Sequence, residues 1–209
     1  MPGLSRRFGH MISLNHKGES AVENLNALKN LPVVPVLKRK HGAARALFDA
    51  RRRAREAGAA RPAPEPFVRS ERIKSSYLAI RSDQGRWLYG QVISTGAKEI
   101  VEFGSSFGIS TLYLAAGAVE TGGRVTGSEF HPEKAEKARA NLKEVGLPAE
   151  ILEGDVRETL VAPGPDIDLV FLDGAKDLYL PVLDLLLPRL HRGSGAIADN
   201  IPTNREARK

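Results

Sequence analysis

The stretch Glu99-Ile-Val-Glu-Phe-Gly-Ser-Ser-Phe-Gly-Ile-Ser110 decides the expected fold. Its first five residues read as a short apolar strand, and the apolar run from Ile109 to Val119 reads as a helix. Gly104 and Gly108 stand between them, where the chain must turn sharply and a ligand can approach the backbone. Such a loop after a parallel strand is where α/β sheets bind ligands. Alone it is weak evidence, and Ser106 breaks the dinucleotide fingerprint G-x-G-x-x-G.

Strands and helices alternate along the chain on either side of this stretch. We expect strands over 99–103, 123–129, 149–153, 167–172 and 194–198, and helices over 84–94, 109–119, 132–145 and 178–190. This alternation predicts an α/β fold with a doubly wound, mostly parallel sheet. We assign this domain to residues 71–209.

Residues 1–70 differ in character, and we interpret them as an N-terminal basic helical arm that ends in a proline-rich linker. Nine Lys and Arg residues between Lys38 and Arg61 face only Asp49 and Glu56, and a helix is expected over 42–57. Three prolines then exclude a helix over 61–67. The arginine run is either a solvated helix face or a contact for RNA or an anionic substrate.

The composition excludes several classes of protein. The 209 residues carry a formal net charge of +6 and no cysteine, which excludes disulfides, thiolate metal sites and cysteine nucleophiles. No apolar stretch approaches the ~18 residues of a membrane span, and no secretory signal is evident. We therefore expect a cytoplasmic protein with no membrane contact.

Polar residues follow three of the expected strands in turn. Glu102 and Gly104 lie at the first strand end, Glu129 at the second, and Asp155 at the third. A carboxylate at the second strand end can accept hydrogen bonds from a ribose diol. Together these positions predict an adenosine-containing ligand across the sheet. The alternatives are a solvent-facing Glu129 and an Asp155 that only caps a helix.

The most specific pattern follows the fourth and fifth strands. Asp173-Gly-Ala-Lys176 comes after one, and Asp199-Asn200 after the other. Three oxygen ligands from adjacent strand ends suit a hard divalent cation that keeps open positions for water and substrate. The absence of cysteine and of a nearby histidine disfavours zinc.

At this point the chain resembles a known family. Four segments between Ser82 and Asn200 are similar to segments of the class I S-adenosylmethionine-dependent methyltransferases: VEFGSSFGIS, GSEFHPEKA, VFLDGAKDLYLP and ADN. The similarity is greatest to the metal-dependent O-methyltransferases of the catechol and caffeoyl-coenzyme A type. The resemblance implies S-adenosylmethionine as cofactor, Mg²⁺ or Mn²⁺ as metal, and a Rossmann-like methyltransferase fold.

The resemblance also implies roles for individual residues. The metal ligands are Asp173, Asp199 and Asn200, and the catalytic residues are Lys176, as general base, and Asp173. The cofactor contacts are Glu102, Gly104, Ser105, Gly108, Ser110, Glu129, Asp155, Val156, Arg157 and Asp173.

The chain departs from the family pattern after Asn200, because the family continues with a helix and two more strands. We expect the sheet to lack these last two strands and to stop at five, with an open edge that a partner chain, such as a second copy in a homodimer, could complete. The expected activity is metal-dependent O-methylation of a small catechol-like or vicinal-diol acceptor. The alternatives are methylation of a hydroxylated base in transfer RNA, with the basic arm holding phosphates, and an inactive cofactor-binding module.

Overall fold

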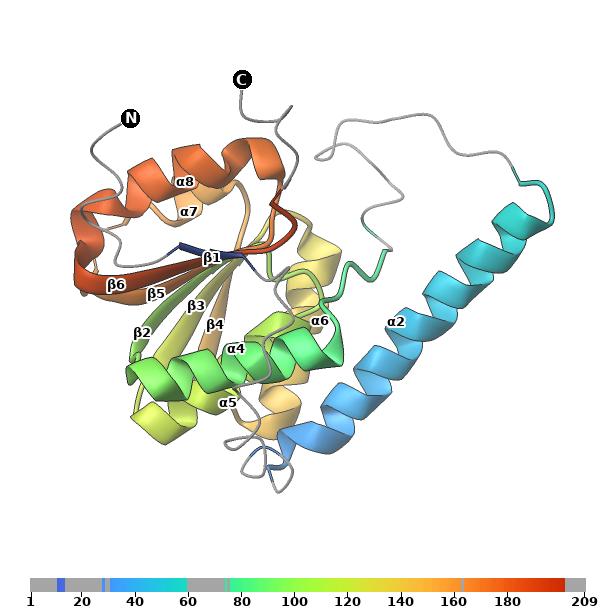
Figure 1. Ribbon diagram of the computed structural model, residues 1–209, viewed down its shortest axis with the longest axis horizontal. Coiled ribbons are helices and arrows are strands. Elements are labelled where there is room, and N and C mark those ends of the chain that lie inside the picture. Colours follow the sequence, from blue (N-terminus) through green and yellow to red (C-terminus); the bar gives the residue numbers. More distant parts are fainter. Residues whose placement is uncertain are drawn as a thin grey trace.

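A six-stranded parallel sheet forms the centre of the computed structural model, which describes residues 11–13, 28, 31–59, 74, 76–162 and 164–201 (Figure 1). The strands are β1 (Met11–Ser13), β2 (Glu99–Phe103), β3 (Arg124–Glu129), β4 (Ala149–Glu153), β5 (Ile167–Leu172) and β6 (Leu190–Ala198). Their order is β1-β6-β5-β2-β3-β4, and every neighbouring pair is parallel. The chain moves outward from β2 in one direction and from β5 in the other, so the order reverses between these two strands. This confirms the predicted doubly wound α/β fold.

Helices cover both faces of the sheet. They are α2 (Val33–Glu56), α4 (Ser82–Thr95), α5 (Ile109–Thr121), α6 (Pro132–Val145), α7 (Val156–Thr159) and α8 (Tyr179–Leu186), with 3₁₀ turns η2 (Lys176–Leu178) and η3 (Leu187–Arg189) around α8. The helix expected over 178–190 is therefore shorter, because Pro188 lies in the 3₁₀ turn that ends it. No helix within the described ranges is long and apolar enough to cross a membrane.

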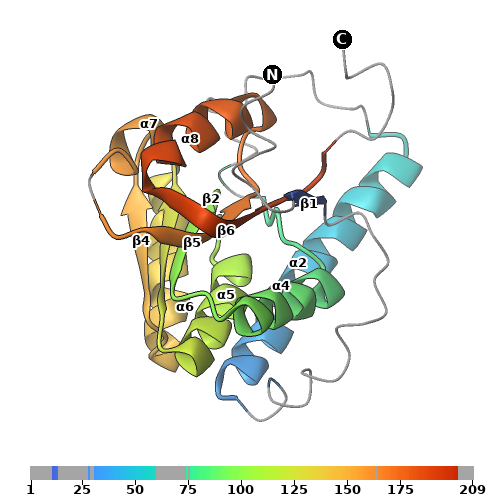
Figure 2. The same cartoon turned by 60° about the vertical axis from the view of Figure 1, so that its left-hand side comes forward.

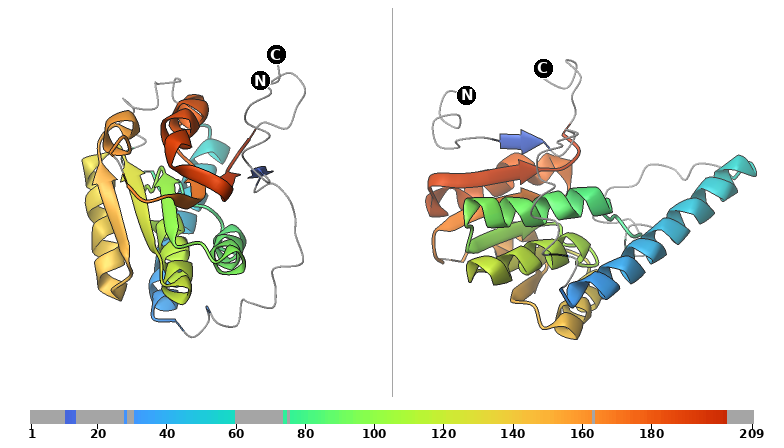
Figure 3. Two further views of the ribbon diagram at one scale, coloured as in Figure 1. Left: turned by 90° about the vertical axis from the view of Figure 1, so that its left-hand side faces the viewer. Right: turned by 60° about the horizontal axis from the view of Figure 1, so that its bottom comes forward.

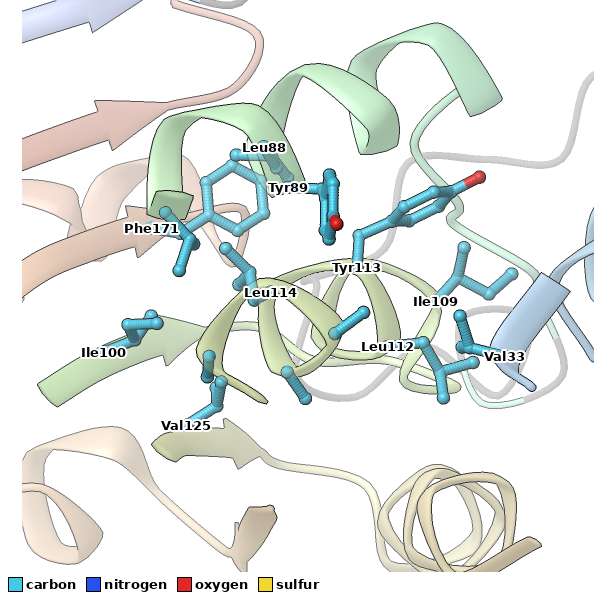
Figure 4. Packing of buried hydrophobic residues seen from close by; sticks show 14 of the residues in the cluster. Val33, Leu88, Tyr89, Ile100, Ile109, Leu112, Tyr113, Leu114, Val125 and Phe171 are labelled. Carbon is cyan, nitrogen blue, oxygen red and sulfur yellow. The ribbon is translucent and has the colours of Figure 1, made fainter. Parts of the chain in front are cut away.

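Side chains along each strand point alternately to the two faces of the sheet, so the core has two layers. Ile100 and Phe171 pack with helices α4, α5 and α6, as Figure 4 shows for the α4–α5 side. Their neighbours Val101 and Val170 point to the opposite face, where Val182 of α8 lies. Figure 2 shows the sheet between these two layers of helices. Burial on both faces explains why β5 reads as an almost unbroken apolar run.

Helix α2 packs into the core only at its beginning. Val33, Val36 and Leu37 are its buried residues, and this apolar turn explains why the helix starts at Val33 rather than at the expected residue 42. Further along, His41 Nε2 and the Tyr113 hydroxyl are hydrogen-bonded at 3.0 Å. Beyond this contact the helix projects away from the sheet (Figures 1 and 3). The proline-rich linker over 61–67 lies outside the described residues.

The edge of the sheet beside β6 differs from the expectation. The five predicted strands are all present, but β1, from the segment interpreted as an arm, adds a sixth. Met11, Ile12 and Ser13 pair in parallel with Ala196, Ile197 and Ala198. A strand of three residues carries too little periodicity to be predicted from its sequence. Pairing here satisfies backbone groups that an open edge would leave to solvent.

Candidate cofactor and acceptor site

A cavity of about 660 Å³, counted out to open solvent, lies at the carboxyl ends of the strands. Leu78, before α4, lines it. The other residues that line it come from the ends of β2, β3, β4 and β5 and from the segments that follow: Phe103, Gly104, Ser106, Ser128, Glu129, Phe130, Lys134, Gly154, Asp155, Val156, Arg157, Asp173, Gly174, Ala175 and Leu178. It sits where the strand order reverses, the position at which open α/β sheets bind ligands.

The turn after β2 is built for close packing. Gly104 has φ +94°, and a Cβ there would stand 2.6 Å from the backbone nitrogen of Gly174. Gly104 thus lets the β2 loop pass against the loop after β5. Gly108, at φ +79°, lies 3.1 Å from the Ala138 Cβ by the same measure, so its missing side chain serves contact with α6, and it does not line the cavity.

Glu102 is fully buried behind this turn rather than in the cavity wall. Its Oε2 accepts hydrogen bonds from Ser105 Oγ at 2.7 Å and from Thr111 Oγ1, while its Oε1 has no hydrogen-bond partner among the described residues. Burial raises the pKa of Glu102, an effect that the nearby hydroxyls partly oppose. Ser105 and Ser110 line a small adjoining pocket that shares Leu78 and Ser106 with the main cavity.

Glu129 ends β3 inside the cavity wall and is only 7% exposed. Its Oε2 accepts a hydrogen bond from the backbone amide of Ser106 at 2.8 Å, and its Oε1 accepts one from the amide of His131 at 2.9 Å. Each carboxylate oxygen offers about two acceptor positions, so one remains free on each. The carboxylate is therefore held in place and can still accept two hydroxyl groups. The solvent-facing alternative for Glu129 is excluded by its burial.

Asp155 both lines the cavity and caps the short helix α7. Its carboxylate accepts hydrogen bonds from the Arg157 backbone amide and Nε, each at 2.9 Å, and from Arg157 Nη2 at 2.5 Å. The hydrogen bond from Arg157 lowers the pKa of Asp155. The two interpretations of Asp155 are thus compatible, and Val156 beside it is buried in the cavity wall.

The predicted metal ligands Asp173, Asp199 and Asn200 follow the ends of β5 and β6. Asp199 is buried, and burial followed by the charge of Asp199 raises the pKa of Asp173 to about 7. Asn200, in the left-handed region at φ 54°, donates from Nδ2 to Asp199 Oδ2 at 2.7 Å. Lys176 Nζ lies 3.4 Å from Asp173 Oδ1.

These donors fit a hard divalent cation. The negative charges of Asp173 and Asp199 repel one another, and a cation between the two carboxylates would offset this repulsion. The side-chain oxygen of Asn200 takes no part in the hydrogen bond to Asp199 and can serve as a further ligand. Across the described ranges, no group of three or more His, Cys, Asp or Glu side chains could hold a metal. Any metal at this site would therefore depend on the amide of Asn200 and on non-protein ligands as well as on the two carboxylates.

Sequence reasoning missed two side chains of the site. The Tyr179 hydroxyl accepts a hydrogen bond from Lys176 Nζ at 2.5 Å and donates one to the Asp199 carbonyl at 3.1 Å. The spacing of three residues from Lys176 would have indicated this neighbour, had the turn η2 been expected. Lys134 lines the cavity from α6, and nothing in its sequence context distinguishes it from the exposed lysines around it.

The chain has the Rossmann-like fold of class I methyltransferases. Residues 101–201 match the family model described as a methyltransferase domain. The chain is 34% identical, over 128 residues, to a catechol O-methyltransferase of Mycobacterium tuberculosis (strain ATCC 25618 / H37Rv), a match that covers 59% of this chain and 57% of that protein. It thus spans less than two thirds of that relative's length.

Solved structures show the same fold. The cofactor-bound protein Rv0187 from MTB has a TM-score of 0.58 and 25% identity, and the match covers 80% of this chain and 64% of that one. The O-methyltransferase from Bacillus cereus in complex with SAH has a TM-score of 0.54 and 24% identity, covering 63% of this chain and 66% of its own. These matches confirm the predicted resemblance to class I O-methyltransferases of the catechol type.

Proposed function

We propose that this protein is an S-adenosylmethionine- and divalent-cation-dependent O-methyltransferase for a small catechol-like or other vicinal-diol acceptor. The observation that carries this proposal is the position of Asp173. It lines the cavity at the carboxyl ends of the strands, and the negative charge of Asp199 acts on its carboxylate. A methyl donor and an oxygen-chelating centre would therefore meet at one carboxylate. The similarity to catechol O-methyltransferase supports the acceptor class.

Each of the chain's own residues has a definite task in this proposal. When bound, S-adenosylmethionine supplies the methyl group, and Mg²⁺ or Mn²⁺ held by Asp173, Asp199 and Asn200 lowers the pKa of the acceptor hydroxyl. Lys176 accepts the hydroxyl proton at Nζ. Tyr179 orients that nitrogen through the 2.5 Å hydrogen bond. Alignment of this kind is worth roughly 7–11 kcal/mol in well-oriented reactions.

Metal removal tests the proposal. A chelator should abolish methyl transfer to catechols or flavonoids, while the affinity for S-adenosylhomocysteine and the melting temperature stay nearly unchanged, because such open sites bind magnesium loosely. Mg²⁺ or Mn²⁺ should restore turnover, and Ca²⁺ should do so poorly. Full activity in excess chelator would contradict the metal-dependent mechanism. Cofactor binding without turnover of any diol would favour an inactive cofactor-binding module.

A matched pair of variants sharpens this test. Asp173→Asn should remove turnover, whereas Asp177→Asn should leave it close to wild type, because Asp177 is exposed in the turn η2 that follows. Lys176→Met should lower the rate and keep Mn²⁺ binding, which electron paramagnetic resonance measures directly. Equal loss in Asp173→Asn and Asp177→Asn would indicate a general effect of charge rather than a metal ligand.

A second candidate, RNA as the methyl acceptor, is favoured by the projecting half of α2. Arg45, Arg52, Arg53 and Arg55 are exposed there, and only Arg52 has a carboxylate partner among the described residues, Glu56 at 3.6 Å. Each phosphate contact releases counterions, so replacing these four arginines with glutamine should flatten the salt dependence of transfer RNA binding. Absence of RNA binding at low salt would indicate that the arginines only form a solvated helix face.

Two further expectations, a homodimer and a domain boundary at residue 70, stay predictions.

A further inference from the structure

Lys134, the third residue of α6, is an unusual side chain for its position. It is 2% exposed and lines the cavity together with Glu129. Lysine is almost never fully buried unless its ammonium is paired, since an unpaired charge in such a place carries a large desolvation penalty. Burial, partly opposed by the charge of Glu129, lowers the pKa of Lys134.

The ammonium of Lys134 has no polar partner in the part of the chain that the structure describes. No hydrogen bond and no ion pair joins its Nζ to a described residue, and its nearest recorded contact is the ring of Phe107, with the ring centre 5.5 Å away. That ring stacks on Tyr77 at 4.2 Å. A donor without a described partner, on a side chain buried in a cavity wall, points to a ligand that supplies the acceptor.

Glu129 offers hydrogen-bond acceptors close to the donors of Lys134 that lack a described partner. Its two backbone hydrogen bonds leave one acceptor position free on each oxygen, as described above. It acts on Lys134 electrostatically without forming an ion pair with it. A hydroxyl group both donates and accepts a hydrogen bond, so a hydroxyl placed between the two can donate to the carboxylate and accept from the ammonium.

We propose that Lys134 is a ribose-positioning residue of the cofactor site, whose ammonium donates a hydrogen bond to a ribose hydroxyl that in turn donates to Glu129. This inference rests on the proposed function, because it requires that the cavity bind an adenosine cofactor. The ribose diol of the cofactor is then recognised by two residues, Lys134 and Glu129, instead of by the Glu129 carboxylate alone.

The chain provides a matched control in Lys137. Its Nζ lies 5.3 Å from the centre of the same Phe107 ring, but the side chain is exposed and does not line the cavity. The two lysines therefore share their aromatic contact and their helix, and they differ in access to the cavity. A general effect of losing one positive charge near the cofactor should therefore appear in both Lys134→Met and Lys137→Met.

Calorimetry with S-adenosylhomocysteine and its 2′-deoxy and 3′-deoxy analogues tests the proposal. Wild-type protein should bind the analogue that lacks the bridging hydroxyl at least tenfold more weakly, the scale of a lost charged hydrogen bond of about 1.5 kcal/mol. Lys134→Met should bind S-adenosylhomocysteine about 10- to 100-fold more weakly and should distinguish the analogues much less. Lys137→Met should behave as wild type.

Folding is controlled by the melting temperature. Lys134→Met replaces an unpaired buried charge with an apolar chain of similar length, so the ligand-free variant should melt at or above the wild-type temperature. Should this variant fail to fold, Lys134→Arg, which keeps the charge and the donors, should retain more discrimination than Lys134→Gln.

Three results would overturn the inference. If Lys134→Met binds S-adenosylhomocysteine within twofold of wild type, this inference is wrong and the proposed function stands. The same holds if Lys134→Met retains the full discrimination between the analogues. Failure of the wild-type protein to bind S-adenosylhomocysteine at all overturns the proposed function and this inference with it.

Discussion

Glu129 shows how one side chain serves the loop and the ligand at once. Its oxygens hold the amides of Ser106 and His131, so Glu129→Ala leaves two donors without their acceptors. We expect this variant to lose about 1–3 kcal/mol of unfolding free energy and about 1.5–3 kcal/mol of S-adenosylhomocysteine binding free energy. Urea denaturation and calorimetry measure the two losses. Glu133→Ala, at an exposed position four residues on, is the control, and an equal effect there would argue against a specific role for Glu129.

Two histidines should titrate on opposite sides of the ordinary value of 6.5. Burial, followed by the charge of Arg86, lowers the pKa of His41, whereas the hydrogen bond with Asp168, 2.9 Å from its Nε2, raises the pKa of His191. Nuclear magnetic resonance titration, with the chain's five histidines assigned by substitution, measures both. Asp168→Asn should bring the pKa of His191 back toward 6.5 and leave His41 unchanged.

The signs follow from which state binds the proton. The stability that His191 contributes is fully present below pH 6.5 and is lost as pH rises through its raised pKa in the folded protein. The stability that His41 contributes is present above pH 6.5 and is lost as pH falls toward its lowered folded pKa. A single histidine titration midpoint for both residues would contradict the structural environments described for them.

At the scale of elements, the close contact between α4 and α5 uses glycines, among them Gly85. A Cβ at Gly85 would lie 2.2 Å from the ring of Tyr113, so Gly85→Ala requires the buried Tyr113 ring or the helices themselves to move. We expect a loss of about 1–3 kcal/mol of unfolding free energy, the usual result of overpacking. Gly42, also within a helix, has nothing within 4 Å of the same added atom. Gly42→Ala should leave stability unchanged or raise it by about 0.5–1 kcal/mol. Equal effects in urea denaturation would refute the packing argument.

The elements that sequence predicted correctly are those whose pattern is local. Strands 99–103, 149–153 and 167–172 and the helix 132–145 have the expected bounds, because each is a continuous apolar or amphipathic run with clear ends. The start of α2 and the strand β1 were not predicted, since both depend on contacts with distant parts of the chain. The same holds in the site, where the buried state of Lys134 depends on how α6 packs against the β2 loop.

At the scale of the whole molecule, β1 joins one end of the described chain to the other. Ile12→Pro removes a backbone donor from the three-residue strand and restrains the residue before it. We expect hydrogen exchange to accelerate over residues 196–198 of β6, with no change over residues 169–172 of β5. Mass spectrometry of peptides from the two strands measures this difference. Unchanged exchange in β6 would show that β1 contributes nothing to its protection.

The pairing of Met11 with Ala196 also fixes an order of events during protein synthesis. The two residues are 185 positions apart (196 minus 11), and a ribosome adds roughly 5–20 residues per second, so β1 waits about 10–40 s for its partner strand. Strands β2 to β5 are all made within that interval and can begin to pair. Strand β1, which is made before the other five strands, is thus among the last to find its place in the sheet.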